Sequence, residues 1–160
     1  MTVLAQTVYF ITHPDVVIDP AIPVPDWPLS SRGRARMEQA LTLPWMSGIR
    51  AVWCSTERKA LDGAEMLATH LRLPVNRLAG LGENDRSATG YLPSTEFEAM
   101  ADAFFADPEQ SVRGWERAID AQHRIVTAVD QVISASHACG GDIAIVSHGG
   151  GLSAILCLRP

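Results

Sequence analysis

Long apolar runs, cysteine motifs and an excess of basic residues are all missing from this sequence of 160 residues. No apolar run approaches the ~20 residues that a membrane-spanning helix needs, and the N-terminus lacks a basic stretch followed by an apolar segment. The formal net charge of −5 provides no basic field for nucleic acid or for an anionic membrane. We therefore expect a cytoplasmic protein that has neither nucleic acid nor a membrane as a partner.

Cysteine is scarce, and its few copies are scattered. Cys54, Cys139 and Cys157 are far apart in the sequence and form no C-x-x-C pair. The odd count argues against a disulfide framework, and the spacing argues against a structural zinc site. We interpret the three thiols as small buried hydrophobic groups.

Apolar residues, in contrast, are plentiful. Hydrophobic residues make up 47% of the chain and charged residues 19%, which is typical of a globular protein. A chain of this length can form one sizeable core, so we expect a single domain over residues 1–160. Three short apolar runs, at residues 7–11, 49–54 and 142–147, predict strands buried on both faces, and residues 74–78 predict a short edge strand.

Amphipathic patterns between these runs predict helices. Alternation of strands and helices favours an α/β fold, a three-layer sandwich with a mostly parallel central sheet and helices on both faces. The proline-rich segment 19–28 and residues 81–93 are expected to be loops. The predicted helices run from a Ser30 or Ser31 cap to about residue 43, from a Ser55 or Thr56 cap to about 71, onward from a Thr95–Glu98 capping box, from about 112 to 136, and from about 151 to 158.

A polar side chain follows each of the three buried strands. His13 comes after the first, Ser55 after the second and His148 after the third. Ligands bind at the carboxyl ends of parallel strands, so these groups are expected to share one site. Gly149 and the helix that begins near Ser55 offer backbone N–H groups to an anion. Phosphate suits such a site, and a histidine there can attack phosphorus.

A zinc site is an alternative use of the same residues. His13 and His148, with Glu83 or Asp15, would make a His₂-carboxylate set. Their local spacing matches no recognised metal motif, so phosphate remains the favoured ligand.

Several motifs are similar to those of the histidine phosphatase superfamily, which has the phosphoglycerate-mutase-like fold, over about residues 7–156. T-H-P at residues 12–14 stands where the family has Arg-His-Gly. P-L-S-S-R-G-R-A-R-M-E-Q-A (28–40), C-S-T-E-R-K-A-L-D-G-A-E (54–65) and L-G-E (81–83) resemble further family segments, and I-V-S-H-G-G (145–150) is the closest match.

The resemblance implies a role for each matching residue. His13 would be the nucleophile, Glu83 the general acid, and His148 a donor to the transferring oxygens, with the Gly149 N–H nearby. The candidate phosphate-binding side chains are Thr12, Ser55, Lys59 and Arg86. The resemblance implies no cofactor and no metal, because fixed donors would meet the charge of the phosphoryl group.

The departures from the family pattern concern the cations. Thr12 replaces the family's first arginine, and Lys59 stands at the position of the second. An ammonium cannot grip two oxygens as a guanidinium does, and losing one such donor can lower a rate on the order of 10²–10³-fold. Lys59 is the only lysine in the chain, beside twelve arginines. Pro14 also removes one backbone N–H from the phosphate cradle. Arg86 and Arg113 are the candidates to compensate.

Two functions follow from these residues. The first is a phosphomonoesterase that forms phospho-His13 on a small phosphorylated substrate or phosphoprotein; a mutase is disfavoured because few cations remain for a second phosphate. The second is a catalytically impaired pseudophosphatase that binds a phosphorylated ligand or partner. Only twelve residues follow His148, so we expect a C-terminally shortened domain, with a monomer or homodimer as its assembly.

Overall fold

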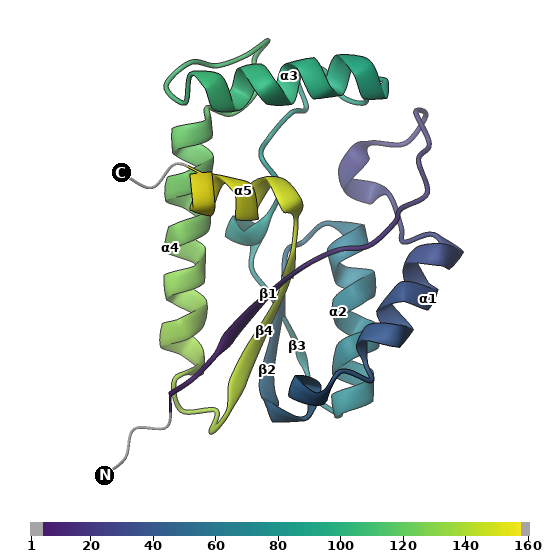
Figure 1. The fold of residues 1–160 in the computed structure, drawn as a ribbon, viewed down its shortest axis with the longest axis vertical. Coiled ribbons are helices and arrows are strands. Elements are labelled where there is room, and N and C mark those ends of the chain that lie inside the picture. Colours follow the sequence, from purple (N-terminus) through teal and green to yellow (C-terminus); the bar gives the residue numbers. More distant parts are fainter. Residues whose placement is uncertain (1–4, 158–160) are drawn as a thin grey trace.

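Four parallel strands form the central sheet of the computed structural model, which describes residues 5–157. The strands β1 (Val8–Thr12), β2 (Ile49–Cys54), β3 (Val75–Arg77) and β4 (Asp142–Ser147) lie in the order β1-β4-β2-β3. β2 and β4 have the predicted bounds, and β3 is the predicted short edge strand. The α/β architecture with helices on both faces is therefore confirmed (Figure 1).

One strand differs from the prediction in its burial. β1 lies at the edge of the sheet, so its residues are half-buried or exposed and not covered on both faces. Its backbone pairs with β4 along its whole length, with Thr12 opposite Ser147. β4 in turn pairs with β2, with Val146 opposite Cys54. This register places the last residues of the three strands side by side at one edge of the sheet.

Two helical layers cover the sheet (Figure 1). The helices α1 (Ser31–Ala40) and α2 (Arg58–Leu71) cover one face, and α4 (Ala118–Ser136) and α5 (Gly149–Cys157) cover the other. α3 (Ser94–Ala106) crosses beyond the carboxyl edge of the strands. Short 3₁₀ helices at Val24–Asp26, Pro44–Gly48 and Ala79–Leu81 complete the connections.

The alternation of β4 shows why both layers form. Ala144 and Val146 point to the α1/α2 side, whereas Ile143 and Ile145 point to the α4 side, as the period of two of a strand requires. A third apolar cluster, which includes Trp115 and Phe104, lies under α3. Within residues 5–157 no helix is both long and apolar enough to cross a membrane.

Helix starts were predicted less well than strands. The Ser30 hydroxyl does cap α1, accepting from the Gly33 N–H at 3.0 Å. α2, however, begins at Arg58 with Glu57 as its N-cap residue, and Pro93 precedes α3 without the predicted Thr95–Glu98 box. α4 begins six residues later than expected, at Ala118, because positive φ angles at Arg113 (48°) and Gly114 (81°) interrupt the helix. The last predicted helix, α5, starts at Gly149, and residue 158 lies outside the described residues.

Candidate active site

His13 leaves the end of β1 in a fixed orientation. Its backbone N–H donates to the Ser147 carbonyl oxygen at 3.0 Å, which extends the β1–β4 ladder by one residue. Its ring Nδ1 lies 2.9 Å from the carbonyl oxygen of Pro14. Burial lowers the pKa of His13 below its ordinary value of 6.5, against an opposing effect of the Pro14 hydrogen bond. The imidazole is therefore neutral at pH 7.

His148 leaves the end of the neighbouring β4 and lies beside His13. The two ring centroids are 5.2 Å apart in an edge-on arrangement. His148 is fully buried, and its Nε2 lies 2.7 Å from the Ser55 hydroxyl oxygen. Burial lowers the pKa of His148 to about 3, although the Glu57 carboxylate opposes this shift. Its Nδ1 is buried and has no hydrogen-bond partner in the described residues, which is rare for a buried polar atom.

Ser55 contacts His148 and is not the N-cap residue of α2, which is Glu57. The Ser55 hydroxyl oxygen accepts from the Glu57 N–H at 3.3 Å and meets His148 on its other side. The structure thus brings together the three strand-end groups that the sequence analysis placed at one edge, His13, Ser55 and His148.

Glu57 is a functional candidate that the sequence analysis missed. Its Oε2 lies 2.5 Å from Lys59 Nζ, and its Oε1 accepts from the Glu83 N–H at 2.9 Å. The same Oε1 is 3.6 Å from His148 Nε2. Burial would raise the pKa of Glu57, but attraction to His148 and Lys59 and these hydrogen bonds together hold it below its ordinary value. A carboxylate therefore lies among the candidate phosphate-binding residues.

Lys59 is buried, with 3% of its surface exposed, and lies at the start of α2. Besides Glu57, its ammonium group donates to the Val24 carbonyl oxygen at 3.0 Å, which ties the proline-rich loop to the site. The only lysine of the chain thus lies in the candidate site, but its charge is already paired with Glu57.

Glu83 enters the site from the loop after the Ala79–Leu81 turn. Burial raises the pKa of Glu83 above its ordinary value of 4.5, with Arg86 acting in the opposite direction. Gly150 is needed beside it, because a Cβ atom at that position would lie 2.2 Å from Glu83 Oε1. The backbone N–H of Asn84 donates to the same Glu83 Oε1 at 3.2 Å.

Arg124 of α4 fixes the loop that carries Glu83. Its guanidinium donates to the carbonyl oxygens of Gly80, Gly82 and Glu83 at 2.9, 3.0 and 3.2 Å. It also donates to Glu116 at 2.9 and 2.8 Å. Sequence reasoning missed Arg124, since nothing in a helix pattern marks an arginine that faces backbone carbonyls.

A cavity of about 790 Å³ is lined by Glu57, Glu83 and Arg124 of this site, whereas His13 and His148 are not among its lining residues. Arg86 lines it from the loop that follows Glu83, and its charge acts on both His13 and Glu83. Arg113 instead faces Glu96, 3.7 Å away, at the surface. The remaining candidates are exposed: Thr12 ends β1, and Gly149 begins α5. The other lining residues include Pro23, Val24 and Asn84.

The zinc alternative gains no geometric support. Among the described residues, no group of three or more His, Cys, Asp or Glu side chains is arranged to hold a metal ion. Asp15 instead pairs with Arg36 at 2.9 Å on the surface side of α1.

Comparison with known proteins points to one family. The sequence profile of the histidine phosphatase superfamily (branch 1) matches residues 21–159. The matched region contains Lys59, Glu83 and His148 but begins after His13. No protein with a curated description matches the sequence.

Solved structures share the fold at low sequence identity. Mycobacterial glucosyl-3-phosphoglycerate phosphatase is 22% identical with a TM-score of 0.79, over 95% of this chain and 78% of that one. YhfR of Bacillus stearothermophilus is 24% identical with a TM-score of 0.75, over 95% and 78% of the two chains. The mycobacterial phosphatase has also been solved with inorganic phosphate.

Proposed function

Because this chain belongs to branch 1 of the histidine phosphatase superfamily, we propose that it hydrolyses phosphate monoesters through a phosphohistidine formed on His13. The substrate would be a small phosphorylated molecule or a phosphoprotein. In this proposal the chain is a divergent member, in which Thr12, His13 and Pro14 replace the family's Arg-His-Gly.

The observation that carries the proposal is the contact between His13 Nδ1 and the Pro14 carbonyl oxygen, at 2.9 Å. A carbonyl oxygen can only accept, so Nδ1 carries the proton. A neutral imidazole then has its lone pair on Nε2, the nitrogen that would attack phosphorus. Proline in place of glycine keeps this carbonyl, so the substitution at residue 14 preserves the orienting bond.

The unpartnered nitrogen of His148 suits a phosphoryl oxygen. In this proposal the Ser55 hydroxyl, which accepts from the Glu57 N–H, donates its own proton to His148 Nε2. In the neutral ring the single proton would then lie on Nδ1, which is buried without a partner among residues 5–157. A phosphoryl oxygen would supply the missing acceptor.

Glu83 would carry the proton in both half-reactions. In the first, His13 Nε2 bonds to phosphorus while the ester P–O bond breaks, and protonated Glu83 gives its proton to the leaving oxygen. In the second, Glu83 takes a proton from water as the water oxygen bonds to phosphorus and the P–N bond breaks. Inorganic phosphate and the initial state of the enzyme result. The raised pKa of Glu83 suits the first of these roles.

One observation favours a second function, binding of a phosphorylated ligand without turnover. The Glu57 carboxylate already pairs with Lys59, and Thr12 contributes no charge. Two arginines line the cavity, and Arg124 is paired with Glu116, so Arg86 is left to bind phosphate. Such a site would bind phosphate weakly and stabilise the transition state less than an arginine pair does.

Hydrolysis of 4-nitrophenyl phosphate near pH 6 separates the two functions. The parent protein is compared with His13→Ala and with His123→Ala, a control that changes an exposed histidine of α4. Hydrolysis is expected with the parent and the control, and an acid-labile phosphoprotein is expected to accumulate on rapid quenching. Equal rates for the parent and His13→Ala would refute the phosphatase. If the parent hydrolyses nothing but binds vanadate, the binding function is established instead.

A further inference from the structure

A second, smaller cavity lies next to the candidate active site. It has a volume of about 220 Å³, and three of its lining residues, Val24, Arg86 and Gly90, also line the larger cavity. The two cavities are therefore neighbours, with Arg86 at their boundary. A phosphate ester bound in the larger cavity would extend its leaving group, the part beyond the ester oxygen, into the smaller cavity.

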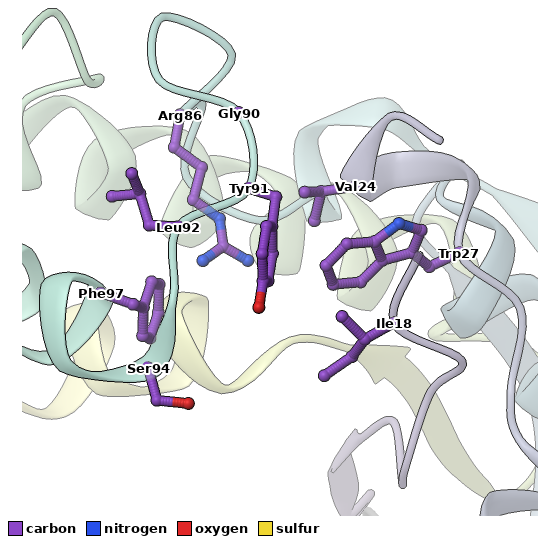
Figure 2. Close-up of a pocket in the computed structure, with 9 residues that line it drawn as sticks. All are labelled: Ile18, Val24, Trp27, Arg86, Gly90, Tyr91, Leu92, Ser94 and Phe97. Carbon is purple, nitrogen blue, oxygen red and sulfur yellow. The ribbon is translucent and has the colours of Figure 1, made fainter. Parts of the chain in front are cut away.

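The wall of the smaller cavity is mainly aromatic and aliphatic (Figure 2). Trp27 comes from the proline-rich loop, and Tyr91 and Phe97 come from the segment that follows Glu83. The Trp27 and Tyr91 ring centroids are 5.7 Å apart and tilted by 57°. Arg86 lies over Phe97, with its guanidinium carbon 4.7 Å from the ring centroid. Ile18 and Leu92 complete the apolar lining.

Trp27 is held in place independently of any ligand. Its indole N–H donates to the carbonyl oxygens of Asp19 and Ile22 at 2.9 and 3.0 Å. The residue is 7% exposed, so the wall at this point is preformed. A preformed apolar wall costs little ordering entropy when a ligand binds.

The rest of the wall is open to solvent. Ile18 is 60% exposed, Tyr91 38% and Phe97 36%, which is unusual for three large apolar side chains around one cavity. A ligand ring placed there would remove this apolar surface from water. A cavity of about 150 Å³ is enough to hold benzene, so the volume of about 220 Å³ accommodates one ring.

From these observations we propose that this cavity binds a planar apolar ring on the leaving group of the phosphate ester. The ring subsite is defined by Ile18, Trp27, Tyr91 and Phe97. This inference rests on the proposed phosphatase function, since the phosphate would lie at His13. Arg86 would mark the junction, facing Phe97 on one side and the phosphate-binding cavity on the other.

Two esters with leaving groups of similar basicity test the subsite. Ethyl phosphate and 2-phenylethyl phosphate both release a primary alcohol, so a difference in kcat/KM reports on the ring. We expect kcat/KM to be about tenfold or more higher for the phenylethyl ester. Equal values for the two esters would overturn the ring subsite while leaving the phosphatase intact.

Variants locate the effect. Tyr91→Ala and Ile18→Ala are expected to bring the ratio of the two kcat/KM values to within about threefold of one. Ile133→Ala changes a side chain of similar exposure, 38%, on α4 and is expected to keep the parent ratio. A ratio that survives both subsite changes would overturn the assignment.

A binding measurement covers the case in which neither ester is hydrolysed. Calorimetry with benzylphosphonate and methylphosphonate then decides: tighter binding of the benzyl compound, lost in Tyr91→Ala, supports the subsite, and equal affinities overturn it. Sedimentation tests whether a second copy of the chain, and not a ligand ring, occupies the cavity. If benzylphosphonate dissociates a dimer that Tyr91→Ala also dissociates, the cavity holds a second copy of the chain, and the inference is wrong.

Discussion

Glu57 and Lys59 form an ion pair inside the candidate phosphate site, with Glu57 Oε2 2.5 Å from Lys59 Nζ. Two residues apart on a helix, these side chains would not face each other. They meet because Glu57 precedes the helix, with an extended backbone (φ −76°, ψ 142°) that turns its side chain toward the strand ends. The only lysine of the chain thus enters the site already neutralised.

Removing the charge of Glu57 is expected to strengthen anion binding. Glu57→Gln keeps the side-chain shape but frees Lys59 and removes a negative charge close to His148. We expect inorganic phosphate or vanadate to bind about tenfold tighter, which corresponds to about 1.4 kcal/mol. Titration calorimetry measures this, with Glu65→Gln, an exposed glutamate of α2, as the control. Unchanged or weaker binding would show that Glu57 does not compete with phosphate.

Removing Lys59 is expected to destabilise the fold. Lys59→Met leaves the Glu57 carboxylate without its cation, and both side chains are largely buried, at 3% and 14% exposure. Loss of one partner of such a pair costs about 3 kcal/mol of unfolding free energy. The double variant Lys59→Met/Glu57→Gln should recover more than half of that loss. Urea denaturation measures all three proteins, and a double variant no more stable than the single one would contradict this account of the pair.

The pH dependence of kcat/KM should be bell-shaped. His13 must be neutral to attack, and its pKa lies below 6.5, so the acid limb falls below that pH. Glu83 must be protonated to serve the leaving oxygen, and its pKa lies above 4.5, so the alkaline limb falls above that pH. Glu83→Gln should abolish the alkaline limb and lower the rate. A Glu83→Gln profile that keeps the alkaline limb of the parent would be inconsistent with these roles.

Stability should fall with acid because of His148. Its pKa is about 3 in the folded chain and 6.5 when unfolded, so between these values the unfolded chain binds more protons. The stabilisation is complete above pH 6.5 and is lost as the pH falls toward 3. His148→Gln should reduce the slope of unfolding free energy against pH in this window, measured by urea denaturation at a series of pH values. An unchanged slope would mean that another group accounts for the acid lability.

The sequence predicted the strands that carry this site better than the side-chain contacts within it. Strands β2 and β4 were predicted to the residue because their apolar runs are short and uninterrupted, and the parallel order then brought His13 and His148 together. The edge position of β1 could not be predicted, since pairing order depends on long-range packing. Ser55 was assigned a role in the site and also, wrongly, a helix cap.

Glu57 shows why the side-chain contacts of the site were harder to predict. A glutamate next to a helix start is usually a solvated side chain, and a sequence pattern does not reveal an extended N-cap that turns the carboxylate inward. The one available signal was its position two residues before the only lysine. Likewise, the aromatic residues Trp27 and Tyr91 are 64 positions apart, and only the fold places their rings 5.7 Å from each other.

Arg124 is expected to act as a positioning residue for Glu83. Its guanidinium binds the carbonyl oxygens of Gly80, Gly82 and Glu83, so Arg124→Gln should let Glu83 shift from its place beside Gly150. A displacement near 1 Å can cost about 10²-fold in rate. We expect kcat to fall about 10- to 100-fold.

A stability loss alone would not produce the accompanying changes. With Arg124→Gln the alkaline limb of the pH profile should move, because Glu83 leaves its buried position, while the affinity for vanadate changes less than threefold, because His13 and His148 stay in place. Arg117→Gln, which removes only the exposed pair with Asp120 at 2.6 Å, is the matched control and should behave as the parent. If Arg124→Gln lowered vanadate affinity as much as kcat, with the alkaline limb unmoved, Arg124 would be supporting the whole site and not the position of Glu83.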